Sequence, residues 1–263
     1  MKPFKAKISL IKNSRGCYIL DTVKGCSIVN TLEGGCYHDC YAFNIAKRYK
    51  LDFGRTVKRG FEMDYGQPPL FGFEDSAHLN ETIRAIRKAD MPFIRIGEMG
   101  DPSWDWRHTF AVMEQIKPAG KPIVIITKHW TPIPDDLLPE LAGVCVNTSV
   151  SALDADGDRI YRLEQYNRLE SHCKSVLRIV SCNFNPENHE GQERAWVQNE
   201  LFKNENVLDT VFRPSPKNPF LERGVILAAK TKFMKSMVLA SVHNPKTYLG
   251  HCGTCPEMCG VTL

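Results

Sequence analysis

Three cysteines lie close together near the start of the sequence, in a segment that also contains paired glycines. Cys26, Cys36 and Cys40 are separated by nine and then three residues, and Gly34 and Gly35 precede the second of them. A structural zinc site takes four protein ligands, whereas a 4Fe–4S cluster held by three cysteines leaves one iron open. The glycines let the backbone turn tightly around such a group. The segment therefore predicts a three-thiolate metal centre; the alternative is reduced thiols buried in the core.

A second group of three cysteines lies in the segment HCGTCPEMCG, residues 251–260. Cys252, Cys255 and Cys259 are separated by two and then three residues, a spacing typical of a metal site. Zinc and an auxiliary 4Fe–4S cluster are both chemically reasonable there. The candidates for a fourth ligand are His251, His243 and Cys17. The alternative is that one of the two cysteine groups binds no metal. The remaining cysteines are expected to be core thiols: Cys145, Cys173 and Cys182.

Short apolar and β-branched runs alternate with amphipathic stretches along the chain. The expected strands are residues 17–22, 92–98, 122–128, 144–150, 175–181, 209–214 and 237–242. The expected helices are residues 77–89, 108–117, 158–171 and 193–203, and another opens at Tyr41. Such alternation favours a parallel sheet with helices packed outside it. The sequence predicts an α/β fold: a partial or complete parallel (β/α) barrel over residues 1–240, with a Cys-rich metal-binding tail at 241–263 packed on the barrel.

Polar segments rich in glycine or proline follow nearly every expected strand. They read IGEMGDPSW, ITKHW, NTSVSALD, VSCNFN and FRPSP. Each alone could be an ordinary loop, but functional groups of parallel α/β folds gather where strands end, so together they predict one pocket. In the first segment Gly97 permits close approach of the backbone, and Glu98 or Asp101 can accept hydrogen bonds from an ammonium group. The third segment adds Ser149 and Ser151.

A strand followed by a cysteine-rich loop that closes in Cys-Tyr-Ala before a helix resembles the radical S-adenosylmethionine (SAM) enzymes. The usual cysteine spacing in that superfamily is three and then two residues, whereas here it is nine and then three. The resemblance implies a 4Fe–4S cluster on Cys26, Cys36 and Cys40, an external one-electron reductant such as flavodoxin or ferredoxin, and hydrogen abstraction by a 5′-deoxyadenosyl radical. Arg178 suits the SAM carboxylate because its planar fork matches two oxygens, although it can equally extend to solvent. The full set of residues implied to bind SAM is Tyr41, Gly97, Glu98, Asp101, Ser149, Ser151 and Arg178.

The compact length, the wide cysteine spacing and the cysteine-rich tail are similar to the queuine lyase family. This resemblance implies cleavage of the base–ribose bond of queuosine or queuosine-5′-phosphate, which releases the 7-deazaguanine base queuine. The base edge needs a carboxylate, and the candidates are Glu33 and Asp105, beside Asp39 and Asp101. A 5′-phosphate needs cations, and the candidates are Lys128, Arg213 and Lys217. Any of these charged side chains could instead be solvated at the surface.

The 263-residue chain has a formal charge of only +4 and no basic runs, which argues against a nucleic-acid partner. No stretch approaches the ~20 apolar residues that span a bilayer, and the start lacks the apolar core of a signal peptide. Ten cysteines without an export signal favour metal or redox chemistry in the cytoplasm over disulfides. Two alternatives to a nucleoside lyase remain: another radical SAM reaction, such as lesion repair similar to spore photoproduct lyase, and a non-catalytic zinc-binding protein.

Overall fold

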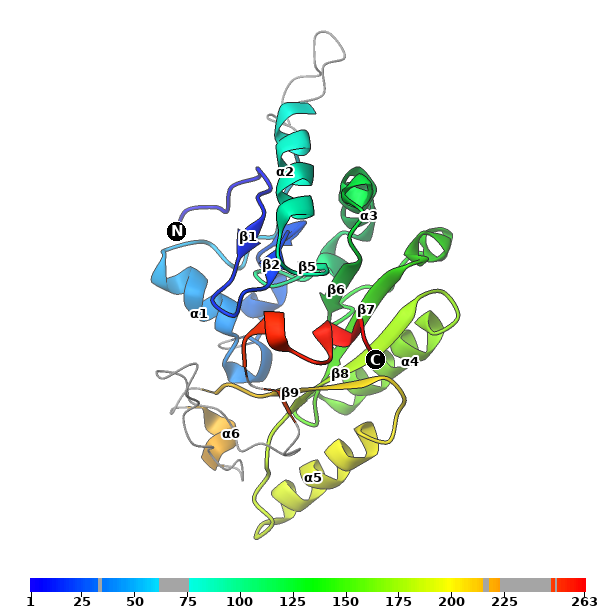
Figure 1. Ribbon diagram of the computed structural model, residues 1–263. Helices are drawn as coiled ribbons and strands as arrows, with labels where there is room; N and C mark the ends of the chain where they lie inside the picture. The colour runs from blue at the N-terminus through cyan, green and yellow to red at the C-terminus, as the bar shows by residue number, and fades with distance from the viewer. Residues whose placement is uncertain (33–34, 62–75, 215–217, 223–246, 249) are drawn as a thin grey trace.

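The computed structural model describes residues 1–32, 35–61, 76–214, 218–222, 247–248 and 250–263. Its main feature is a seven-stranded sheet in the order β1-β2-β5-β6-β7-β8-β9 (Figure 1). β1 pairs antiparallel with β2, and every other pair in this sheet is parallel. Its strands are β1 (Ile11–Lys12), β2 (Tyr18–Ile19), β5 (Ile94–Ile96), β6 (Ile123–Thr127), β7 (Val144–Val150), β8 (Lys174–Ser181) and β9 (Val207–Val211). The predicted α/β class with a mostly parallel sheet is therefore confirmed.

Helices supply most of the crossovers that parallel pairing requires. α3 lies between β5 and β6, α4 between β7 and β8, and α5 between β8 and β9. Four predicted helices are confirmed to within a few residues: 77–89, 108–117, 158–171 and 193–203. The helices are α1 (Tyr41–Arg48), α2 (Ser76–Lys88), α3 (Trp106–Ile116), α4 (Asp156–Leu169), α5 (His189–Leu201) and α6 (Pro219–Glu222). A separate two-stranded antiparallel sheet joins β3 (Val23–Lys24) to β4 (Val57–Lys58).

The seven-stranded sheet is covered on both faces, and alternate residues of each strand point to opposite faces. This is why β7, VCVNTSV, is buried at every position. One face packs under α2 and α3. The opposite face, here called the inner face, packs against the C-terminal tail (residues 250–263) through Phe93, Val124, Cys145, Val176 and Leu208. Figure 1 shows the tail lying across the strands of the sheet.

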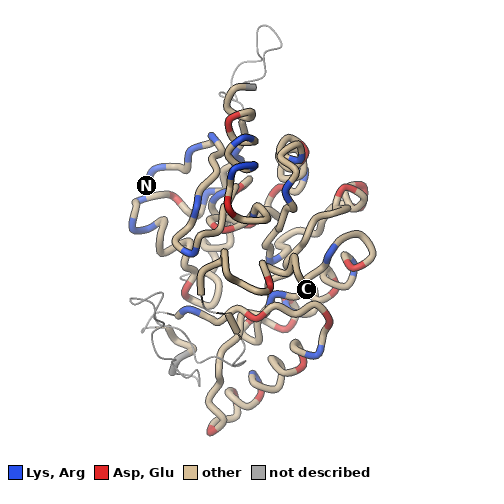
Figure 2. The backbone as a smooth tube through the Cα atoms, in the orientation of Figure 1, with Lys and Arg blue, Asp and Glu red and all other residues tan. Residues whose placement is uncertain are grey.

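Both signs of charge occur along the surface helices α2 and α5 (Figure 2). Within the described residues, no helix combines the length and apolarity needed to cross a bilayer. The expected strand 237–242 and the expected boundary between residues 240 and 241 lie outside the described residues.

Candidate functional site

The N-terminal cysteine loop connects β3 to α1. Cys26 and Cys36 lie at the starts of two short 3-10 helices, and Cys40 directly precedes α1, which begins at Tyr41 as predicted. Gly35 has a φ of +77° and no room for a side chain, because a Cβ there would lie 2.7 Å from the Cys40 Cβ. Only glycine combines this conformation with so close an approach. The loop therefore folds back tightly against its third cysteine.

The three thiols lie near enough to affect one another's ionisation. Burial and a neighbouring thiol together raise the pKa of Cys26 to about 12 and the pKa of Cys36 to about 11. A bound metal cation would lower these pKa values, because it stabilises the thiolate form. Among the described residues, no three His, Cys, Asp or Glu side chains already stand in a metal-binding arrangement, so binding requires thiols to rotate. Three thiols on one glycine-folded loop, with Cys36 coupled to the other two, nevertheless fit a thiolate-bound cluster.

A cavity of about 280 Å³ separates this loop from the inner face of the sheet. Two of the three cysteines line it, and Cys26 lies beneath the loop in an apolar cluster with Ala42 and Phe53. The opposite walls come from residues that end or follow the parallel strands, where α/β folds carry their sites. The cavity brings together these predicted site residues: Cys36, Cys40, Tyr41, Gly97, Glu98, Lys128, Ser149, Arg178 and Arg213.

The turn after β5 is held from several sides. The backbone N–H groups of Glu98 and Met99 donate to the buried Asp21 carboxylate at 2.8 and 3.2 Å. The Tyr41 hydroxyl donates to the Glu98 carbonyl at 2.8 Å, which ties the turn to the start of α1. The Glu98 carboxylate lies 3.2 Å from the Arg95 guanidinium and lines the cavity. The turn thus presents a fixed carboxylate that can accept hydrogen bonds from a ligand cation.

Two residues predicted to bind SAM lie outside this cavity and have protein partners. The buried Asp101 carboxylate accepts hydrogen bonds from the Thr127 hydroxyl and the Lys128 N–H, each at 2.7 Å. The Ser151 hydroxyl is fully buried and donates to the Val180 carbonyl at 2.7 Å. Asp101 therefore connects the segments that follow β5 and β6, and Ser151 connects β7 to β8.

Of the residues predicted to bind the substrate, some line the cavity and others lie outside it. Asp105 lies outside the cavity, because it caps α3 through the His108 N–H and pairs with Lys58 at 2.5 Å. Glu33 and Lys217 lie outside the described residues. Lys128, Arg213 and the alternative carboxylate Asp39 do line the cavity.

Arg15 and Arg95 line the cavity but were not among the predicted residues. Arg95 lies in the middle of β5 between two buried isoleucines, so a charged residue inside an apolar strand was a signal that could have identified it. Arg178 occupies the corresponding kind of position in β8. Arg15 lies in the turn between β1 and β2, where nothing in the sequence distinguishes it from a surface arginine.

A buried ionic network holds the cysteine loop against the ends of β6 and β7. The Lys128 ammonium donates to the Tyr37 hydroxyl at 2.5 Å and to the Asp154 carboxylate at 3.2 Å. Arg162 of α4 lies 2.5 Å from the same carboxylate and donates to the Lys128 carbonyl at 2.9 Å. Burial raises the pKa of Asp154, but Lys128 and Arg162 outweigh that effect and hold it below its usual value. The Asp154 carboxylate is therefore the shared counter-ion of Lys128 and Arg162.

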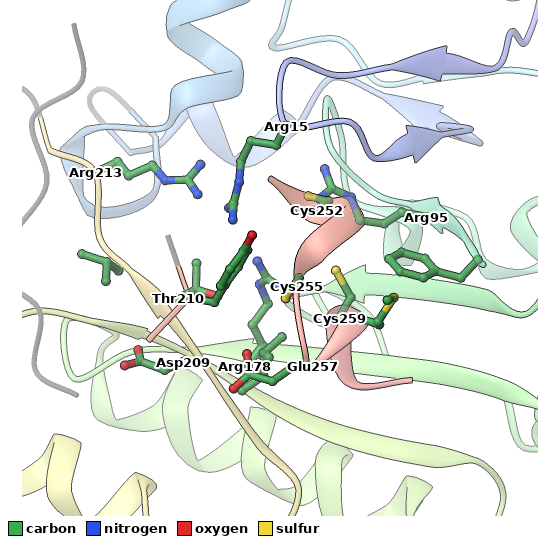
Figure 3. Close-up of a pocket in the computed structure, with 15 residues that line it drawn as sticks. Arg15, Arg95, Arg178, Asp209, Thr210, Arg213, Cys252, Cys255, Glu257 and Cys259 are labelled. Carbon is green, nitrogen blue, oxygen red and sulfur yellow. The ribbon is translucent and has the colours of Figure 1, made fainter. Parts of the chain in front are cut away.

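The C-terminal tail forms a second cysteine site on the inner face. Figure 3 shows Cys252, Cys255 and Cys259 beside a smaller cavity of about 50 Å³ that arginines also line. The Asn147 amide donates to the Cys259 carbonyl at 3.0 Å, which anchors the tail to β7. At Gly260, with φ +90°, a Cβ would lie 2.6 Å from the Val176 side chain, so the tail packs directly on β8.

Cys17 is the better placed of the described candidates for a fourth ligand. Its thiol lies beside the Cys252 sulfur, and this contact lowers the pKa of Cys252 to about 6. The His251 ring instead lies against Gly16, and its Nδ1 accepts from the Gly253 N–H at 3.2 Å. His243 lies outside the described residues. Elsewhere Cys145 and Cys182 are buried and Cys173 is partly buried, as expected for core thiols.

Comparisons with protein families, curated proteins and solved structures find no match to this chain. Function is therefore inferred from the side chains and their arrangement.

We expect Gly97→Ala to destabilise the protein. Gly97 has a φ of +96°, and a Cβ there would lie 2.3 Å from the Ile126 carbonyl oxygen, which is backbone and cannot rotate away. The substitution should lower the free energy of unfolding by on the order of 1–3 kcal/mol in urea titrations, because it combines strain with overlap. The matched control is Gly157→Ala in α4, where a Cβ meets nothing within 4 Å and helix propensity favours alanine. Equal stability of the two variants would contradict this account of the turn.

Proposed function

We propose that this chain is a radical SAM enzyme built on a partial parallel (β/α) barrel and acting on a nucleoside or nucleotide. The observation that carries the proposal is that Cys36 and Cys40, from a loop of three coupled thiols, share one cavity with the Gly97–Glu98 turn. A cluster on the thiols and a ligand ammonium on Glu98 would then lie on two sides of the same volume. This is the arrangement that SAM bound to an open iron requires.

Each wall of the cavity has a proposed task. Cys26, Cys36 and Cys40 hold the 4Fe–4S cluster, which when bound supplies the electron that cleaves SAM to a 5′-deoxyadenosyl radical. Glu98 accepts hydrogen bonds from the SAM ammonium, and Arg178 with Ser149 binds its carboxylate. The surrounding walls exclude water from the radical. An external flavodoxin or ferredoxin supplies the electrons, and the reaction takes place in the cytoplasm.

The proposed substrate is queuosine or queuosine-5′-phosphate, and the proposed reaction releases queuine by cleaving the base–ribose bond. The cavity supports a small substrate with an anionic group, because Lys128 and Arg213 line it. Asp39 takes the place of Asp105 as the carboxylate proposed for the base edge, since it lines the cavity. Mixed charge on the surface helices supports a small molecule over a nucleic-acid polymer (Figure 2). The tail is proposed to hold a second centre, zinc or iron–sulfur.

The proposal predicts two products from the anaerobically reconstituted protein. With dithionite and SAM we expect 5′-deoxyadenosine, and with added queuosine-5′-phosphate we expect free queuine, both measured by liquid chromatography and mass spectrometry. Protein that carries zinc without iron or sulfide after reconstitution would indicate the non-catalytic alternative. Formation of 5′-deoxyadenosine without release of queuine would keep the radical chemistry and reject this substrate.

A further inference from the structure

Four arginines meet on the inner face between the N-terminal cysteine loop and the tail. Both the larger and the smaller cavity are lined by Arg15, Arg95, Arg178 and Arg213. They come from the β1–β2 turn, β5, β8 and the segment after β9. Figure 3 shows the guanidinium groups of Arg15, Arg178 and Arg213 directed toward a common space beside the tail. Segments distant in the sequence thus deliver several positive charges to one place.

Among the described residues, only one of these four arginines forms an ion pair with a carboxylate. Arg95 pairs with Glu98 at 3.2 Å, and Arg15 donates to the uncharged Gly250 carbonyl at 2.9 and 3.1 Å. Within the part of the chain that the structure describes, Arg178 and Arg213 form no ion pair with any Asp or Glu. A buried charge without a partner is costly, so such groups are normally matched by an anion. The group of four arginines therefore has an excess of positive charge, which an anionic ligand can neutralise.

The acidic residues on the same walls do not fill this need. The Asp209 carboxylate accepts hydrogen bonds from the hydroxyls of Ser181, at 2.5 Å, and Thr247. Glu257 lines only the smaller cavity, and among the described residues it forms no ion pair with any of the four arginines. In addition, the Arg95 Nε is buried and has no hydrogen-bond partner in the structure. An incoming anion would thus meet guanidinium groups that are free to donate.

We infer that Arg15, Arg178 and Arg213 bind a phosphate monoester carried by the substrate, so that the enzyme takes the phosphorylated nucleotide rather than the free nucleoside. A dianion matches several converging guanidinium forks, whereas the SAM carboxylate carries one charge and needs one fork. The inference rests on the proposed function for the identity of the nucleotide. Arg15 and Arg213 then bind only the substrate, and Arg178 is shared between the two ligands, because the proposed function also assigns it to the SAM carboxylate.

The test compares two probes that differ only in the phosphate: guanosine 5′-monophosphate and guanosine. Isothermal titration calorimetry on the purified full chain should show the nucleotide binding at least about tenfold more tightly, because charge-assisted hydrogen bonds exceed 1.4 kcal/mol. Arg213→Met should abolish this preference and leave the affinity for SAM unchanged. Arg84→Met on the exposed face of α2 is the matched control and should retain the preference.

Thermal unfolding of the unliganded variants tests whether Arg213→Met loses nucleotide binding only because the protein is destabilised. Arg213→Met should keep or raise the parent's unfolding midpoint, because it removes a half-buried cation that other arginines repel. A lower midpoint would show that Arg213 has a structural partner and would overturn the inference. Equal or absent binding of both probes, or loss of SAM binding instead of nucleotide binding in Arg213→Met, would overturn it too. The outcome is independent of 5′-deoxyadenosine formation, so each proposal can fail while the other stands.

Discussion

Replacing Cys36 with alanine should abolish iron binding at the N-terminal loop and, with it, the formation of 5′-deoxyadenosine. Cys36 is the thiol that couples to both of its neighbours and lines the cavity, so its loss leaves two separated donors. Changing even outer partners of a metal centre costs about 10–100-fold, and we expect loss of a ligand to exceed about 100-fold. Iron and sulfide content, and 5′-deoxyadenosine yield after anaerobic reconstitution, measure the two effects.

The matched control for this experiment is Cys173→Ala. Cys173 is also partly buried, but its thiol donates only to the Leu169 carbonyl in the turn after α4 and lies outside both cavities. The control should keep its full iron content and yield. If Cys36→Ala instead retains both properties, the catalytic cluster is not on this loop, and the tail cysteines become the alternative.

Replacing Asp154 with asparagine should cause the largest loss of stability. Asn has nearly the same shape, but it leaves the buried cations Lys128 and Arg162 without their shared counter-charge. Breaking a buried ion pair from one side costs about 3–5 kcal/mol, which urea titration at pH 7 would measure. The effect should also depend on pH, because the pKa of Asp154 is lower in the folded protein than in the unfolded chain. The stabilisation is then complete above about pH 4 and disappears as the pH falls through the folded-state pKa.

Asp136→Asn is the matched control, because it removes the same charge from an exposed ion pair. Asp136 pairs with Arg107 at 2.8 Å, but both side chains are largely exposed. Asp136→Asn should therefore change stability far less, because water screens the pair. A similar loss in both variants, or a loss in Asp154→Asn that does not shrink as the pH falls through the acid range, would refute the assigned role of Asp154.

The sequence predicted the elements whose patterns are long and local. β6, β7 and β8 are rich in β-branched residues, and α2 to α5 lie in stretches with helical patterns, so these elements lie close to their expected positions. β2 lies within the strand expected at residues 17–22, whereas β1, β3 and β4 have two residues each, which is too short for any period to be visible. The cysteine spacing, in contrast, was visible without any structure.

The roles of the polar residues were harder to predict, because they depend on neighbours distant in sequence. Asp101 resembled a ligand for an ammonium group, yet Thr127 and Lys128 already occupy its oxygens. Conversely, Arg95 gained a site only when the fold placed it opposite Arg213 and the tail. Residue type and spacing identify candidate chemistry, whereas accessibility is decided by contacts between distant segments.

Hydrogen bonds to the turn around Arg15 hold the start of the tail in place. The Arg15 guanidinium reaches the Gly250 carbonyl, and the Cys252 N–H donates to the Arg15 carbonyl at 2.7 Å, across a sequence separation of about 235 residues. Doubling the length of such a loop adds only ~0.6 kcal/mol of closure entropy. Insertions in the intervening surface loops should therefore be tolerated over evolution without releasing the tail, whereas a change at the turn around Arg15 acts on it directly.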